Sequence, residues 1–162
     1  MFDLTGKALK PIPLPYRVPK GKIYVDAANS VLSVAQLPFG NNAQVVWSQN
    51  FDGKVLNTIK GNHLCIKPDF SNEIYSSKNT SGFDFNIFTF FELRPDTAYH
   101  YDYVNNKLLP KFTLDFKNKT RKIHSYYELP RHFIGDVTVE VKLSENLSTT
   151  EYPAMYIVDK NT

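Results

Sequence analysis

Histidine and cysteine side chains are the ones most able to bind a metal or attack a substrate, so their spacing is the first test for chemistry. The four histidines are His63, His100, His124 and His132. No two of them stand three to five residues apart, which is the spacing typical of a zinc-binding pair. Cys65 is the only cysteine, which excludes an intrachain disulfide and a cysteine-rich zinc site. The sequence therefore predicts no metal and no cofactor.

The acidic residues that could serve as catalytic groups lie beside predicted turns. They are Asp26, Asp84, Asp96 and Asp136. Capping of a turn explains an aspartate at such a place, although Asp26 and Asp136 could instead face a channel and hold Ca²⁺. The chain contains no Gly-x-Ser-x-Gly, no glycine-rich phosphate loop and no His-Glu-x-x-His. We therefore predict no catalytic residue, and we favour a role without catalysis over an enzyme.

Aromatic and basic residues at two places in the chain are the candidates for a binding site. The candidate binding residues are Tyr99, Tyr101, Tyr126, Tyr127, Arg131 and His132. Aromatic platforms with polar rims suit sugars, peptides and partner proteins. The alternative is that these large side chains fill the space between neighbouring sheets. Arg131, beside His132 on a proline-bounded loop, is the position least typical of a core, and the loops expected to contact a ligand are Pro38–Asn42, Ser76–Phe83 and Tyr126–His132.

Composition limits the class of protein. The chain has 162 residues, enough for one domain, with 42% hydrophobic, 22% charged and 14% aromatic residues. Its formal net charge of +3 is small and dispersed, so the sequence predicts no nucleic-acid partner. No stretch approaches the 18 apolar residues of a membrane-spanning helix, and residues 1–10 contain no apolar signal-peptide core.

Strand patterns dominate the chain, and helical patterns are nearly absent. Runs of β-branched and aromatic residues alternate with polar ones and end at turn residues, which is typical of half-buried strands. The clearest runs are 31–37, 44–51, 85–93, 98–103, 111–116 and 137–143. The sequence therefore predicts an all-β fold.

One turn motif recurs at intervals of roughly 50 residues. An apolar or aromatic residue is followed by Asp and then by a Gly or Asn turn that contains Lys. The four copies begin at Phe2, Phe51, Tyr101 and Val158. We interpret the motif as a hairpin in which Asp caps the turn and Gly or Asn adopts a positive φ. Such a period with about four short strands indicates a β-propeller blade, and an irregular β-sandwich or barrel is the alternative.

The repeats divide a single β-propeller segment into about three four-stranded antiparallel blades. Residues 1–14 would supply an outer strand, 21–60 and 63–116 one blade each, and 122–162 a blade without its outer strand. Three blades cannot close a ring, because propellers have four to eight. Two explanations stay open: the chain is part of a six-bladed propeller whose missing blades belong to a longer chain, or two copies form a six-bladed dimeric ring.

Three segments carry a family resemblance. They are Phe90–Tyr101 with its Asp-Thr step, Leu108–Phe116 with its Leu-Pro-Lys-Phe-Thr-Leu-Asp-Phe run, and the hairpin Tyr156–Thr162. In these segments the chain resembles the six-bladed β-propeller proteins of Bacteroides-type bacteria. The resemblance implies an extracytoplasmic protein, periplasmic or at the cell surface, of uncharacterised biochemical role and without a catalytic motif. Full members of that family are about twice this size and usually begin with an export or lipoprotein signal, which this chain does not show.

The function predicted from these patterns is that of a non-enzymatic binding or scaffold β-propeller that recognises a protein or a glycan. The alternative is a propeller hydrolase or lyase with a metal ion in its channel. Expected partners are a protein or glycan ligand, and either a second copy of the chain or the missing blades of a longer one. Neither nucleic acid nor a membrane span is expected.

Overall fold

The computed structural model describes residues 4–18, 20–38, 44–61, 64, 73–77, 82–88, 96–114 and 122–161. These residues form eleven β-strands and no helix, which confirms the all-β prediction. His63, Cys65 and the first two residues of the earliest copy of the turn motif, Phe2 and Asp3, lie outside the described residues. In the described part of that copy, Gly6 has the expected positive φ of 83°. Within the ranges given above, no helix has the length and apolar character needed to cross a bilayer.

The strands form three antiparallel sheets, and each sheet is a meander in chain order. The first sheet contains β1 (Lys22–Asp26), β2 (Val31–Ala35), β3 (Gln44–Asn50) and β4 (Val55–Lys60). The second contains β5 (Glu73–Ser76), β6 (Phe83–Phe88), β7 (Asp96–Asp102) and β8 (Lys107–Leu114). The third contains β9 (Lys122–Glu128), β10 (His132–Ser144) and β11 (Leu147–Asp159). Two sheets are thus four-stranded, as predicted, and the third has three strands with β11 at its edge.

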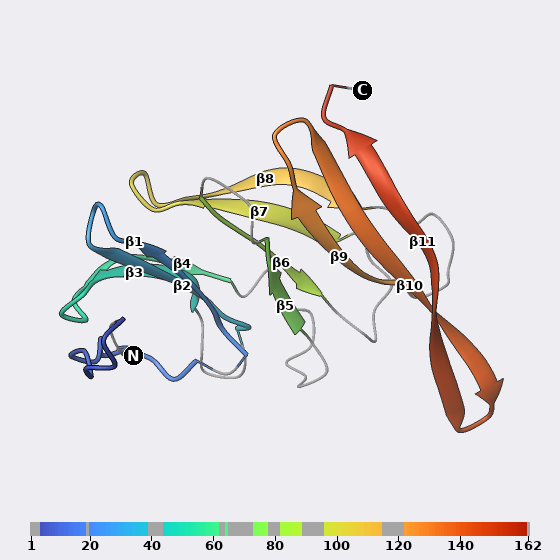
Figure 1. Cartoon of the computed structure of the whole chain (residues 1–162), viewed down its shortest axis with the longest axis horizontal. Helices are drawn as coiled ribbons and strands as arrows, with labels where there is room; N and C mark the ends of the chain where they lie inside the picture. Colours follow the sequence, from blue (N-terminus) through green and yellow to red (C-terminus); the bar gives the residue numbers. More distant parts are fainter. Residues whose placement is uncertain are drawn as a thin grey trace.

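The three sheets follow one another in an open row (Figure 1). Aromatic pairs join each sheet to the next. Tyr24 of β1 stacks on Phe83 of β6, with ring centroids 5.8 Å apart. Phe112 of β8 packs against Tyr126 of β9 and Phe133 of β10, at 4.9 and 4.4 Å. Among the described residues, aromatic side chains therefore contribute to both contacts between neighbouring sheets.

The two central strands of the first sheet, β2 and β3, are buried on both faces. Every residue of β2 is buried, and so are the five central residues of β3. One face contributes to a core shared with the second sheet, which includes Val46 and Tyr101. The other face carries Leu32, Val34 and Trp47, and residues 12, 16 and 18 of the N-terminal segment pack against it. A strand buried on both faces has no need of apolar–polar alternation, and β2 shows none.

The N-terminal segment differs from its expected role as an outer strand. Residues 4–18 contain a single bridge residue, Ala8, and no strand. One hydrogen bond joins the segment to the sheet, from Gln49 Nε2 to the Pro13 carbonyl at 2.8 Å. A second bond, within β3, orients the Gln49 amide, because Trp47 Nε1 donates to Gln49 Oε1 at 3.0 Å. Tyr16 adds an edge-on contact with Trp47 at 5.0 Å between centroids. The segment covers a face of the first sheet instead of extending an edge.

The turn between β7 and β8 has the geometry that the recurring motif predicts. Asp102 Oδ1 accepts from the backbone N–H groups of Val104 and Asn105, at 3.1 and 3.0 Å, and Asn106 has a φ of 50°. Asp159 caps its turn in the same way, because Asn161 N–H donates to Asp159 Oδ1 at 2.9 Å.

The turn between β3 and β4 fits the prediction only in part. Gly53 has the expected positive φ of 87°. The capping side chain is Asn50 and not Asp52, since Asn50 Oδ1 accepts from the N–H groups of Asp52 and Lys54. A Cβ at position 53 would lie 2.6 Å from Pro13 Cγ, so the N-terminal segment also requires glycine here.

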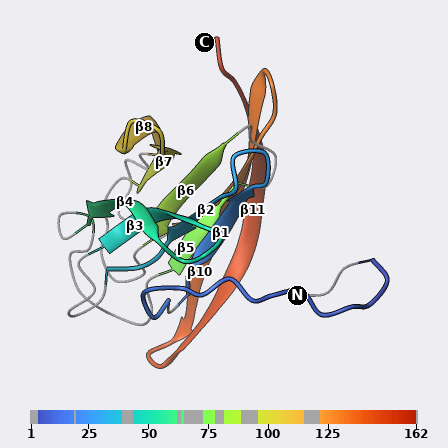
Figure 2. The same ribbon diagram turned by 90° about the vertical axis from the view of Figure 1, so that its left-hand side faces the viewer.

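The third sheet is dominated by the hairpin of β10 and β11, which are 13 residues each. The hairpin runs the full height of the molecule and projects beyond the packed part of the other sheets (Figure 2). Its pairing is interrupted by register shifts between Val137 and Val139 and between Lys142 and Ser144. Phe133, in the part of β10 that pairs with β9, packs on Phe112 of the second sheet.

Candidate functional site

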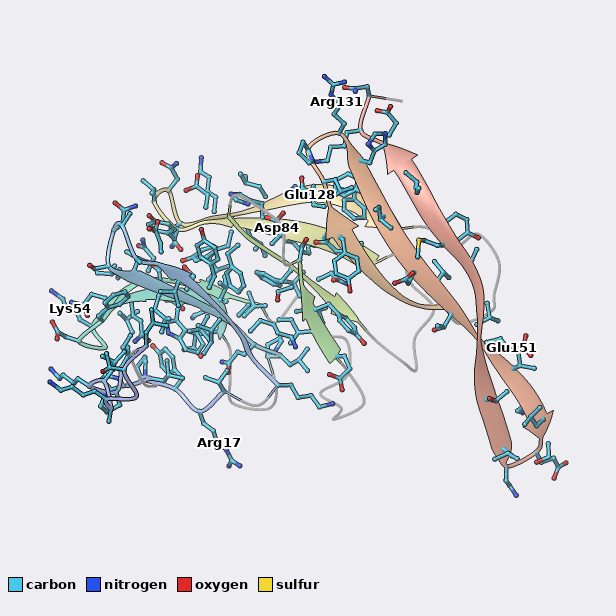
Figure 3. The ribbon with its side chains drawn as sticks, in the orientation of Figure 1. Arg17, Lys54, Asp84, Glu128, Arg131 and Glu151 are labelled. Carbon is cyan, nitrogen blue, oxygen red and sulfur yellow. The ribbon has the colours of Figure 1, made fainter. Side chains whose placement is uncertain are left out.

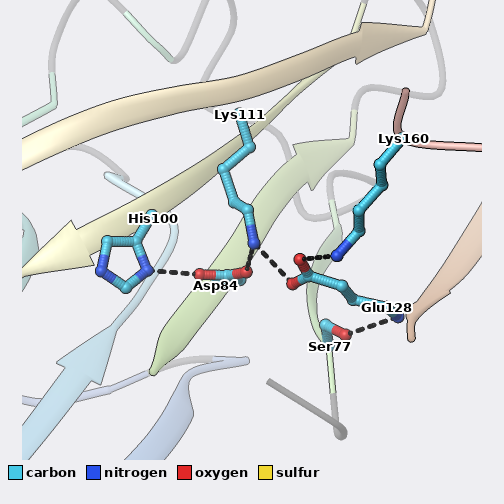
Figure 4. Close-up of polar contacts among 6 residues, drawn as sticks. All are labelled: Ser77, Asp84, His100, Lys111, Glu128 and Lys160. Carbon is cyan, nitrogen blue, oxygen red and sulfur yellow. Dashed lines mark hydrogen bonds and ion pairs between the residues drawn. The ribbon is translucent and has the colours of Figure 1, made fainter. Parts of the chain in front are cut away.

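Five charged or titratable side chains form one connected group between the second and third sheets, called here the interface network: Asp84, His100, Lys111, Glu128 and Lys160. Asp84 Oδ1 lies 2.6 Å from His100 Nδ1, and Asp84 Oδ2 accepts from Lys111 Nζ at 2.5 Å. Glu128 accepts from Lys111 on Oε2 and from Lys160 on Oε1, each at 2.5 Å. Figure 4 shows the resulting chain of alternating charges.

Local backbone features place the members of the interface network. The register between β7 and β8 shifts between Ala98 and Tyr99, whose partners are Phe112 and Pro110, so that Lys111 is the extra residue of a β-bulge. A bulge re-aims a side chain relative to strict alternation. A Cβ at Gly82 would lie 2.5 Å from His100 Cε1, so that glycine leaves room for the imidazole.

The interface network holds its charges in a largely enclosed place. The Asp84 side chain is fully buried and that of Glu128 is 13% exposed. Burial lowers the pKa of the Lys111 ammonium, but its hydrogen bonds to Asp84 and Glu128 outweigh burial and leave that pKa raised. Burial likewise raises the pKa of Glu128, and the hydrogen bonds from Lys111 and Lys160 reverse this and lower it to about 2. Both groups are therefore charged at neutral pH.

Further contacts around the interface network involve an aromatic ring, a serine hydroxyl and a buried tyrosine. Lys160 Nζ lies 4.8 Å from the centroid of the Phe133 ring, a cation–π contact. Glu128 N–H donates to Ser77 Oγ at 3.3 Å, which adds a link from the third sheet to the end of β5. Burial raises the pKa of the Tyr126 hydroxyl, which is therefore neutral over the physiological range.

The interface network satisfies its own charges. Each of the four carboxylate oxygens of Asp84 and Glu128 faces a cationic or imidazole nitrogen. Burial of the two carboxylates strengthens these interactions, and the arrangement presents no unpaired carboxylate to a substrate. Its physical role is to attach the third sheet to the second.

Two of the residues predicted to bind a ligand, Tyr101 and Tyr126, are buried, and a third, Tyr99, is half-buried. Tyr101 is 2% exposed and belongs to the core between the first and second sheets, and Tyr99 packs against the same core. Tyr126 is 7% exposed and packs on Phe112 and Phe133. For these three tyrosines the structure favours the alternative that aromatic side chains fill the space between sheets.

The other predicted residues lie on the outside of the third sheet. Opposed residues of antiparallel strands point to the same face, and Tyr127 opposes Ile134, which in turn opposes Ile157. Tyr127 is 42% exposed, and His132, two residues before Ile134, has a 42% exposed side chain. Arg131 lies at the tip of the adjoining turn and points away from the packed centre, whereas Asp84 and Glu128 lie inside (Figure 3).

This outer surface is called here the far face of the third sheet, and it includes Tyr127, His132, Ile134, Asp136, Met155, Ile157 and Asp159. Met155 and Ile157 are each 67% exposed. The turn that carries Arg131 is held by two backbone bonds, from Leu129 N–H to the His132 carbonyl and from Lys160 N–H to the Arg131 carbonyl. A rigid turn beside an exposed apolar and aromatic surface is suited to contact with another molecule.

The acidic residues divide between capping and other roles. Asp26 caps its turn as expected, because its carboxylate accepts from both the backbone and the side chain of Asn29. It also accepts from the Tyr103 hydroxyl at 2.8 Å, and the hydrogen bonds from Asn29 and Tyr103 lower the pKa of Asp26. Asp84 and Asp136 lie within β6 and β10, so turn capping does not explain them.

No group of three or more His, Cys, Asp or Glu side chains is placed to hold a metal ion within the part of the chain that the structure describes. Asp26 and Asp136, the two carboxylates considered for a channel ion, belong to the first and third sheets.

No family model, curated protein or solved structure matches this chain.

Proposed function

We propose that the chain is a non-enzymatic binding or scaffold module built of β-propeller blades, which recognises a protein or a glycan through its third sheet. The observation that carries the proposal is the far face, where Tyr127 is presented with Met155 and Ile157 beside a rigid turn with Arg131 at its tip. Aliphatic neighbours of this kind favour a protein over a glycan, because sugars select aromatic and polar groups.

Three features support the interpretation of the sheets as blades. Each sheet is an antiparallel meander in chain order, and consecutive sheets pack on one another through aromatic residues. The capped turn follows the third strand of the second sheet at Asp102 and the third strand of the third sheet at Asp159. A repeated supersecondary unit with the same turn at the same place is what a radial array of blades requires. An extracytoplasmic location, suggested by the family resemblance, belongs to the same proposal.

A binding test can be made with defined probes. The protein is applied to a glycan array and to an array of immobilised peptides, alongside the Arg131→Ala and Tyr127→Ala variants. Both residues are exposed, so neither substitution should change folding by more than about 0.5 kcal/mol. We expect at least a tenfold loss of binding to any positive probe, which corresponds to about 1.4 kcal/mol. Leu109→Ala, at an exposed position of β8, is the matched control.

Two results would contradict this proposed function. Binding that both variants retain would remove the far face as the recognition surface. A stoichiometric metal ion held at one site by several carboxylates would favour the alternative of a hydrolase or lyase.

A further inference from the structure

The N-terminal segment that covers the first sheet is held in an extended shape by its own sequence. Prolines alternate with other residues at positions 11, 13 and 15. Proline fixes its own φ and confines the residue before it to extended conformations, so this stretch has little freedom to rearrange. The hydrogen bond from Gln49 to the Pro13 carbonyl then fixes its place on the sheet.

The apolar residues of the segment are divided between an inner and an outer side. Ile12, Tyr16 and Val18 are partly buried against the first sheet. Leu9 and Leu14 remain 43% and 39% exposed. Because the inner side is already occupied and the backbone is restricted, these two leucines are presented to the outside.

Strand β1 adds apolar side chains to the same side of the molecule. Ile23 opposes Val34 and Val25 opposes Leu32, so Ile23 and Val25 share the face of the sheet on which the segment packs. They are 54% and 47% exposed. Together these residues form a surface called here the N-terminal surface: Leu9, Lys10, Leu14, Arg17, Ile23, Val25 and Lys54.

Positive charge is concentrated in the same part of the chain, although the basic residues form no single block. Residues 4–25 include five Lys or Arg and no Asp or Glu. Residues 1–61 contain seven basic and three acidic residues, whereas residues 62–162 contain twelve and thirteen. The small net charge of the whole chain therefore comes from its N-terminal end.

The basic side chains of the N-terminal surface are available for contact. Arg17 and Lys54 project outward from the first sheet and its covering segment (Figure 3). Lys10 lies 3.8 Å from Asp52, but both side chains are at least 80% exposed, and such a pair is weak. Asp26, the other acidic residue of this part, opposes Val31 and accepts from Tyr103 of the second sheet, away from the N-terminal surface.

We propose that the N-terminal surface binds reversibly to a lipid bilayer that carries anionic headgroups. Lys10, Arg17 and Lys54 contact the headgroups, while Leu9 and Leu14 enter the boundary between headgroups and acyl chains. A soluble polyanion would attract the basic residues but would bury neither leucine, and the centre of a protein interface is depleted of lysine. The combination therefore favours a lipid surface. The far face of the third sheet lies at the other end of the row, so this inference goes beyond the proposed function and does not rest on it (Figure 1).

The test is co-sedimentation of the full chain with vesicles of phosphatidylcholine, either alone or with about 30% phosphatidylserine. We expect binding only to the anionic vesicles, and release at about 0.5 M salt because exposed charges are screened. Lys10→Gln combined with Arg17→Gln should weaken binding about 25-fold, since each basic residue near an anionic surface contributes about fivefold. Lys107→Gln combined with Lys142→Gln removes the same charge from exposed positions of the other two sheets and should bind as the wild type does.

A second pair of substitutions distinguishes lipid from a soluble polyanion. Leu9→Ser combined with Leu14→Ser should weaken vesicle binding about tenfold and leave retention on immobilised heparin unchanged. Leu109→Ser, at an exposed position of β8, is the matched control. Every substituted residue is exposed, so circular dichroism should show unchanged folding.

Three outcomes would overturn the proposal. The first is a wild-type chain that does not bind anionic vesicles. The second is equal weakening by the control pair of lysine substitutions, which would mean that overall charge and not this surface is responsible. The third is a leucine variant that binds vesicles as tightly as the wild type, which would assign the basic residues to a soluble polyanion.

Discussion

The first and third sheets are both antiparallel meanders, but they have very different surroundings. β2 and β3 are buried on both faces. One face of these strands packs against the second sheet, and the opposite face packs against the N-terminal segment. The third sheet packs on the second through one face, and its far face and the edge of β11 are exposed. We call the first sheet, whose central strands are covered on both faces, the closed end of the row. The third sheet, whose far face carries exposed apolar side chains, is called the open end, because contact with another molecule there would bury apolar surface.

The two ends are also attached to the second sheet by different interactions. The first is joined by an apolar core that includes Val46, Phe85 and Tyr101. The third is joined by the Phe112 aromatic cluster together with the interface network. A charge-dependent contact is sensitive to pH and to removal of one partner, whereas an apolar contact is sensitive to lost volume.

The largest effect is expected where the open end meets the second sheet. Lys111→Met leaves the fully buried Asp84 carboxylate without its ammonium partner, and such a loss costs about 3–5 kcal/mol. Lys107→Met, at an exposed position of the same strand, should cost at most about 0.5 kcal/mol. Urea unfolding measures both. Equal costs for the two variants would mean that the interface network does not hold the third sheet in place.

Two valines, one in each end sheet, allow the cost of losing a side chain to be compared between the two ends. Val34 in the first sheet is fully buried, and Val158 in the third is 50% exposed. Val34→Ala removes packed methyl groups and should cost about 2–3 kcal/mol, while Val158→Ala should stay within about 0.5 kcal/mol. The measurement is the free energy of unfolding of dilute protein. A large cost at Val158 under dilution would show that β11 is covered within the single chain.

A smaller effect is expected from freeing the N-terminal segment. Gln49→Leu removes the acceptor of the Trp47 N–H and the donor to the Pro13 carbonyl, and should cost about 1–3 kcal/mol. Limited proteolysis should then cut within residues 4–18 faster than in the wild type. Unchanged cleavage there would argue that the segment does not depend on these bonds. Thr58→Leu, on an exposed position of β4, is the control.

The smallest effect concerns acid stability at the open end. The pKa of Glu128 is lowered from its ordinary 4.5 to about 2, so the stability it contributes is present above pH 4.5 and is lost as the pH falls toward 2. Glu128→Gln removes this titration and should flatten the dependence of unfolding free energy on pH over that window. An equally steep dependence in the variant would assign the acid sensitivity to other carboxylates.

Much of the strand framework could be predicted from the sequence, because turns and alternation are local properties. The Asp102 turn with its left-handed Asn106 follows directly from the motif. Lys111 could not be placed, because the bulge that re-aims it arises from pairing with β7. Asp84 resembled a turn cap, and only the tertiary contact with His100 and Lys111 shows its role.

Local sequence patterns also could not predict where the N-terminal segment packs or which tyrosines are buried and which are exposed. Residues 7–14 resemble a strand, but the face of the first sheet that carries Trp47 offers this segment more burial than an edge of the sheet would. Tyr126 and Tyr127 differ only in which face of β9 they occupy, and the sequence does not show which face the second sheet covers.

Residue-resolved hydrogen exchange, measured at a low and a high protein concentration, tests most directly whether the molecule has one closed and one open end. We predict that amides of β2 and β3 are strongly protected at both concentrations. Within residues 154–158, the amides that point away from β10 should exchange far more rapidly than those of β2 and β3. Strong protection of all these amides in dilute protein would contradict the account, since it would mean that β11 has no free edge.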